Sequence, residues 1–163
     1  MLKANSVLKE LDVSSNYGDG SRDGAGFASG IADGVSTNGA LVSANLLNND
    51  IGTKQAQNLA TVLKDHATLK SLCGNKGDET ELDMSGKKMD AVGAIMLAPE
   101  IVANGALEKL LLGKNNIATK EAGEALGQAL AQNSVLKEKT IDVRKENDML
   151  VEKIQTLQVN HDD

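Results

Sequence analysis

The stretch Leu8-Lys-Glu-Leu-Asp-Val-Ser-Ser-Asn16 decides how this 163-residue chain is built, because its pattern returns further along the sequence. The pattern is leucine, two other residues, leucine, one residue, an aliphatic residue, two residues and asparagine. Its clearest later copy runs from Leu107 to Asn115, and a looser copy runs from Leu41 to Asn49. A motif that recurs at such intervals indicates a protein made of stacked supersecondary units.

The asparagine position of the motif sets the length of the unit. Asn16 and Asn49 are 33 residues apart, and Asn49 and Lys87 are 38 apart. Lys87 and Asn115 are 28 residues apart, and Arg144 follows after another 29. The two short intervals define the unit, and the longer ones contain insertions, which agrees with the ~20–29 residues of a short strand–helix repeat. Lys87 and Arg144 depart from asparagine.

Each unit has a second half with helical periodicity. Leu59, Ala60 and Leu63 follow Ala56 at helical spacing, and a similar run follows Ala122. Apolar residues at these intervals are typical of an amphipathic helix. We therefore predict an α/β fold of about four to five strand–helix units, with short parallel strands on one concave face and helices on the convex face. In such a stack, one interior ladder would contain Leu11, Leu46, Leu82 and Leu112.

Two longer segments resemble a known family. They are Asn49-Asp-Ile-Gly52 followed by Ala56-Gln-Asn-Leu-Ala60, and Asn115-Asn-Ile-Ala118 followed by Ala122-Gly-Glu-Ala-Leu126. Both are similar to the ribonuclease-inhibitor-like subfamily of leucine-rich repeats. The resemblance implies a leucine-rich-repeat solenoid over residues 1–144, in which the asparagine side chain satisfies buried loop backbone.

The C-terminal part has a different composition. Residues 145–163 contain no glycine, and Leu150, Ile154 and Leu157 recur at helical spacing. We predict a helix followed by a short tail. Two interpretations remain open, because this helix either caps the end of the solenoid or binds a partner through Leu150, Ile154 and Leu157.

Composition excludes several classes of function. The net charge of −6 provides no basic stripe for phosphates, so we expect no nucleic acid partner. No apolar run approaches the roughly 20 residues needed to span a bilayer, so we expect no membrane insertion. The single cysteine, Cys73, fits a reducing compartment and predicts an intracellular protein, either cytoplasmic or organellar.

The sequence offers no set of residues for catalysis. Cys73 is the only thiol, and His66 and His161 are the only imidazoles. A cysteine–histidine pair needs a third group to orient it, and a metal site needs more ligands at closer spacing. We therefore predict that the chain is not an enzyme and uses no metal, cofactor or small-molecule ligand.

Outward-facing positions of the strands are the candidate binding surface. Side chains alternate along a strand, so the residues between the leucines face away from the core. These candidate residues are Glu10, Asp12, Asn45, Leu47, Glu81, Asp83, Lys109 and Leu111. We predict a non-catalytic module that binds a protein partner through this surface. Two alternatives stay open: a structural subunit whose ends and C-terminal helix are buried in a larger assembly, and a regulator of an enzyme such as a GTPase or a nuclease.

Overall fold

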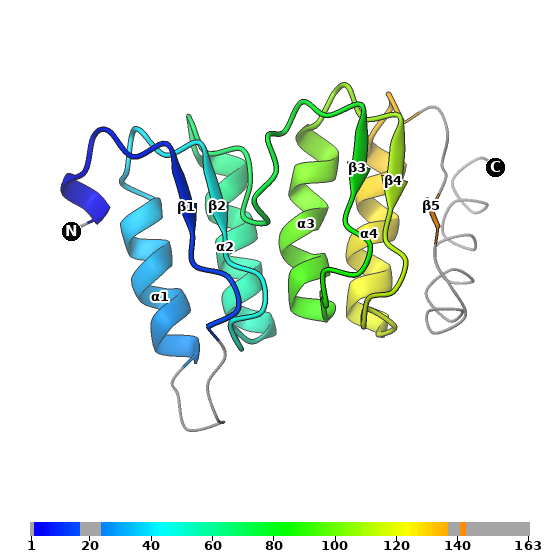
Figure 1. Ribbon diagram of the computed structural model, residues 1–163, viewed down its shortest axis with the longest axis horizontal. Coiled ribbons are helices and arrows are strands. Elements are labelled where there is room, and N and C mark those ends of the chain that lie inside the picture. Colours follow the sequence, from blue (N-terminus) through cyan, green and yellow to red (C-terminus); the bar gives the residue numbers. More distant parts are fainter. Residues whose placement is uncertain (1, 17–23, 137–140, 143–163) are drawn as a thin grey trace.

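The computed structural model describes residues 2–16, 24–136 and 141–142. Strands and helices alternate along the chain (Figure 1). In order, the elements are η1 (Leu2–Ala4), β1 (Glu10–Asp12), α1 (Gly24–Val35), β2 (Ser43–Asn45), α2 (Thr53–Asp65), β3 (Glu81–Asp83), α3 (Ala91–Ala103), β4 (Lys109–Leu111), α4 (Lys120–Gln132) and β5 (Ile141–Asp142).

The strands form one layer and the helices form a second layer behind them (Figure 1). All strand pairs are parallel, and α1 packs on α2, α2 on α3, and α3 on α4. A short strand buries its inner side chains only against a second layer, and the apolar stripes of the helices supply it. The predicted α/β architecture of short parallel strands and covering helices is confirmed at this level.

The strands form two sheets rather than one. β1 pairs with β2, whereas β3, β4 and β5 form a separate three-stranded sheet. The first sheet continues past β2 only through isolated bridges to Ser71 and Cys73. Leu69 and Leu72 thus begin a copy of the motif that the sequence analysis missed, and the loop over residues 74–80 separates it from β3. One continuous solenoid sheet, as the repeat predicted, is not what the structure shows.

The predicted ladder of leucines is also wrong, because the register within each sheet differs from the predicted one by two residues. Leu11 lies opposite Ala44 in the first sheet, and Leu82 lies opposite Leu110 in the second. Leu46 is two residues beyond Ala44 and therefore does not lie beside Leu11. The core is nonetheless continuous across the break, because one cluster of buried apolar side chains extends from Ala28 to Leu136.

Buried asparagines close the turns after β2 and β4. Asn49 Nδ2 donates to the carbonyl oxygen of Val13 at 2.9 Å, and Asn115 Nδ2 donates to that of Met84 at 2.8 Å. Each amide therefore ties its own turn to the turn of the preceding strand. The asparagine column of the motif has the structural role predicted for it at these two turns.

Lys87 replaces the asparagine in the third unit, yet the turn is kept. Gly86 precedes it with φ of 67°, where Asn48 and Lys114 have φ of 58° in their own turns. Glycine adopts this left-handed conformation without steric cost, so the backbone turns even though the lysine side chain is exposed. Arg144 and the predicted C-terminal helix of residues 145–163 lie outside the described residues.

A second recurring position, which the sequence analysis missed, follows the helices. Asn38 and Asn133 each accept hydrogen bonds from the backbone N–H groups two and three residues further on, at 2.8–3.0 Å. His66 Nδ1 accepts the equivalent bonds after α2, at 3.2 and 2.9 Å. Because Nδ1 is an acceptor, Nε2 carries the proton and donates to the carbonyl of Val35 at 2.9 Å. His66 is thus a structural turn residue.

Candidate functional site

The predicted surface residues fall into two groups on the strand layer. Glu10 and Asp12 lie on β1 opposite Ser43 and Asn45 of β2. On the second sheet, the register places Glu81 opposite Lys109 and Asp83 opposite Leu111. The structure therefore brings Glu10, Asp12 and Asn45 together and, separately, Glu81, Asp83, Lys109 and Leu111. We call these seven residues the strand face.

Cross-strand pairs hold part of the strand face in place. Asn45 Nδ2 donates to Asp12 Oδ2 at 3.1 Å. Lys109 Nζ forms an ion pair with Glu81 Oε1 at 3.1 Å, and their side chains are 38% and 53% exposed. An exposed pair of this kind contributes about 1 kcal/mol at most, so both charges remain available to a partner.

Asp12 and Asp83 occupy the same position at the ends of β1 and β3. The Oδ1 atom of each accepts the backbone N–H of the serine two residues further on, Ser14 or Ser85, at 2.8 Å in both cases. These backbone hydrogen bonds lower the pKa of both carboxyls below the ordinary value. The strand face thus carries two aspartates that are fixed in orientation and ionised near neutral pH.

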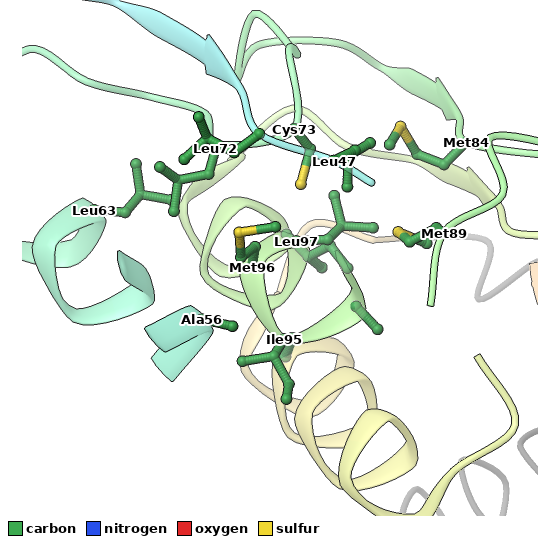
Figure 2. Close-up of a cluster of buried hydrophobic side chains, with 14 of the residues drawn as sticks. Leu47, Ala56, Leu63, Leu72, Cys73, Met84, Met89, Ile95, Met96 and Leu97 are labelled. Carbon is green, nitrogen blue, oxygen red and sulfur yellow. The ribbon is translucent and has the colours of Figure 1, made fainter. Parts of the chain in front are cut away.

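Leu47 does not belong to the strand face. It is 5% exposed and lies in the core beside Cys73, Met89 and Leu97 (Figure 2). Side-chain alternation applies only within a strand, and β2 ends at Asn45. The chain has already begun to turn at Leu47, so its side chain points inward. Leu111 is still part of β4 and is half-buried at the surface.

The three residues predicted to bind a partner through the C-terminal helix cannot be placed. Leu150, Ile154 and Leu157 lie outside the described residues. Binding through that helix therefore stays a prediction from sequence.

Glu100 of α3 forms a buried polar cluster at the break between the sheets. Its carboxylate is 3% exposed and accepts the backbone N–H groups of Leu72 at 2.8 Å and Cys73 at 3.0 Å. Ser71 Oγ and Asn75 Nδ2 also donate to it, both at 2.8 Å. Burial raises the pKa of Glu100, although the four donors act in the opposite direction. A glutamate inside an otherwise uncharged apolar helix was the signal in the sequence.

A groove runs along the helical layer, over α3 and between α2 and α4. Its cavity has a volume of about 410 Å³. The floor is apolar and contains Ala98, Pro99 and Val102 of α3. Polar side chains of α2 and α4 form the walls. This groove was not predicted from the sequence.

The described residues offer no reactive centre. Cys73 is buried, and this burial raises the pKa of its thiol, so the sulfur is protonated and shielded near neutral pH. Within residues 2–16, 24–136 and 141–142, no three histidine, cysteine or acidic side chains gather as a metal site would require. Over the same ranges, none of the helices has the length and apolar character that crossing a bilayer demands.

Comparison with known proteins shows the fold. No known protein family and no curated protein sequence matches this chain. Among solved structures, the chain is similar to actin-binding site 2 of leiomodin-1, with a TM-score of 0.53 and 15% identity over 98% of this chain and 84% of that one. It is also similar to the tropomodulin C-terminal domain of Caenorhabditis elegans, with a TM-score of 0.49 and 10% identity over 96% and 86% of the two chains.

These comparisons correct the family assignment. The chain shares its fold with a leiomodin-1 actin-binding domain, so the assignment to ribonuclease-inhibitor-like leucine-rich repeats is wrong. The motif led to the wrong family because periodic leucines indicate only that strands and helices stack and bury one another. Any fold that stacks short strand–helix units imposes the same requirement, so the period does not identify a family.

Proposed function

We propose that this chain is a non-catalytic protein-binding domain that contacts its partner through the strand face. The observation that carries the proposal is the pair of oriented, ionised aspartates, Asp12 and Asp83, at matching positions of exposed strands. A fixed charge at the surface attracts a complementary partner without the loss of side-chain entropy that a mobile charge suffers on binding.

Actin is the first partner to test. The leiomodin-1 structure that shares this fold is an actin-binding site. At 15% identity no individual contact carries over. The proposal for this chain therefore rests on its own strand face, and the neighbour supplies only the candidate partner.

The test measures binding to filamentous and monomeric actin by cosedimentation and fluorescence anisotropy. The double variant Asp12→Asn/Asp83→Asn keeps the acceptor for each serine N–H but removes both charges. We expect it to weaken binding about tenfold, since each lost charge contact contributes roughly 1 kcal/mol or less. The matched control, Asp33→Asn/Asp65→Asn, removes two charges from exposed positions of α1 and α2 and should bind as the wild type does.

Two results would contradict the proposal. If the wild-type chain binds neither form of actin, actin is not the partner. If a partner binds and the double aspartate variant retains full affinity, the strand face is not the binding surface. Thermal unfolding followed by circular dichroism verifies that both variants remain folded.

A structural subunit of a larger assembly is the second candidate function. Val7, between η1 and β1, is 78% exposed and lies at the end of the strand layer. In this candidate function, a neighbouring molecule in the assembly would cover Val7. This candidate predicts self-association at micromolar concentration in light scattering that Val7→Ser reduces, whereas a monomer favours the binding domain.

A further inference from the structure

We propose that the groove over α3 binds an amphipathic α-helix of a partner protein, oriented antiparallel to α3. The helix would have acidic residues in its first turn, a stripe of apolar residues along one side, and basic residues in its last turn. This second binding surface lies on the helical layer, opposite the strand face, and it does not depend on the proposed function.

The floor of the groove is apolar because α3 presents no charge to solvent. Glu100 is the only charged residue between Ala91 and Ala103, and its carboxylate is buried at the sheet break. The outer side of α3 therefore exposes aliphatic atoms, and Val102 is 38% exposed. Pro99 also lacks a backbone N–H, so the carbonyl of Ile95 in the same groove has lost its usual helical donor.

The walls of the groove are polar. Gln57 and Thr61 of α2 line one side, and Gln128 of α4 lines the other. An apolar floor between polar walls is the arrangement that receives the apolar face of an amphipathic helix, whose anchors recur every three or four residues. Such a helix would bury Val102 and Ala98 while its polar sides stay in contact with water.

The charges of the walls set the direction of the bound helix. Lys64 lies in the last turn of α2, and Glu121 and Glu124 lie near the start of α4. Lys120 forms an exposed ion pair with Glu124 at 3.6 Å, so this end carries a net charge of −1 from the three side chains. The helices run side by side in the same direction, so these charges mark opposite ends of the groove (Figure 1). A helix is stabilised by acids at its start and bases at its end. Only the antiparallel orientation places those acids near Lys64 and those bases near Glu121 and Glu124.

The probe for the test is a fluorescein-labelled synthetic helix of about 16 residues, long enough to be partly helical alone. It carries glutamates in the first turn, leucines at positions separated by three or four residues, and lysines in the last turn. A second peptide exchanges the glutamates and lysines, and a third keeps the composition but scatters the leucines. Fluorescence anisotropy with the full chain measures the three affinities.

We expect the first peptide to bind at least tenfold more tightly than the other two. Val102→Lys should weaken this binding at least tenfold, and Val7→Lys, at an exposed valine outside the groove, should leave it unchanged. Lys64→Glu should reverse the preference toward the peptide with exchanged charges. NMR shift changes in the wild-type chain should gather on α2, α3 and α4, a readout that needs no variant.

The proposal is overturned if the first two peptides bind with equal affinity, since the charges then set no direction. Binding that Val102→Lys leaves unchanged would place the peptide elsewhere. Dimerisation of the chain that Val102→Lys abolishes would assign the groove to a second copy instead. Absence of binding by all three peptides would reject an amphipathic helix as the ligand.

Discussion

The carboxylate of Glu100 on α3 joins the two strand groups, because it accepts backbone N–H groups from the segment that follows the first sheet. Successive N–H groups of a parallel strand point to opposite edges, so in a continuous sheet those of Leu72 and Cys73 would be bonded by the strands on either side. Here the carboxylate of Glu100 accepts both of them, since β3 pairs with β4 and not with this segment. An unpaired buried N–H costs about 1–3 kcal/mol, so Glu100 lowers the free-energy cost of the break between the sheets by accepting these N–H groups.

The first prediction concerns this carboxylate. Glu100→Ala leaves the buried Leu72 N–H without its acceptor, leaves the Cys73 N–H only Ser71 Oγ at 3.0 Å, and opens a cavity. We therefore expect a loss of about 3–5 kcal/mol in the free energy of unfolding. Glu100→Gln keeps one oxygen for both N–H groups and should lose less than half as much. Urea unfolding at pH 7, followed by circular dichroism, gives both values. Equal losses in the two variants would show that the acceptor oxygen is not what stabilises the break.

The direction in which the pKa of Glu100 is shifted predicts how the stability depends on pH. The pKa of Glu100 is raised in the folded state relative to an unfolded value of about 4.3. The folded chain therefore binds this proton more tightly, and the resulting stabilisation is complete below the unfolded pKa and is lost as the pH rises through the folded one. The stability of the wild type minus that of Glu100→Gln should therefore fall as the pH rises above the unfolded pKa of about 4.3. A difference in stability that does not change with pH would contradict the raised pKa of Glu100.

The second prediction compares two asparagines of the same motif column. Asn115 is buried and bonds to the turn of the preceding strand, whereas Asn16 is exposed and bonds mainly within its own turn. We expect Asn115→Ala to reduce the free energy of unfolding by about 2–3 kcal/mol and Asn16→Ala by less than about 1 kcal/mol. Thermal and urea unfolding of both variants tests this. Equal losses would mean that burial does not set the strength of these bonds.

At the scale of elements, α3 packs unusually close to the strand layer. A Cβ atom added to Gly93 would meet the side chain of Met89 and would lie 3.0 Å from Cδ2 of Leu47. Both of these side chains are buried in the core (Figure 2). The close approach of the helix therefore requires glycine at this position, which the apolar pattern alone does not indicate.

The third prediction uses a matched pair of helical glycines. Gly93→Ala gains helix propensity but forces Met89 and Leu47 to move, and we expect a net loss of about 1–2 kcal/mol. Gly30 of α1 has no atom within 4 Å of the added Cβ. Gly30→Ala should therefore gain up to about 1 kcal/mol from helix propensity. Differential scanning calorimetry measures both, and the same sign for both changes would contradict the packing argument.

For the whole molecule, a single core spans a broken sheet. The α2–α3 packing and the Glu100 cluster join the two strand groups, while α3 and α4 share the most extensive contact between elements. The wild type should therefore unfold in one cooperative transition, as small domains with one core usually do.

The fourth prediction tests how the two halves are coupled. Hydrogen exchange in Glu100→Ala should show residues 24–73 losing protection before residues 81–136, because the first half then lacks its bond to α3. In the wild type both ranges should exchange with similar free energies of opening. Uniform loss of protection in the variant would show that helix packing alone couples the halves.

The sequence by itself determined the alternation of short strands and helices, the asparagine turns at Asn49 and Asn115, and most of the strand face. These features depend on local periodicity, because spacing decides which side chains point inward. Only the tertiary structure decided where the sheet breaks, that Leu47 is buried, and that a groove opens over α3. Each depends on groups distant in the chain, such as Glu100 and Ser71, which are 29 residues apart. Spacing within one segment carries no information about which distant segment will lie beside it.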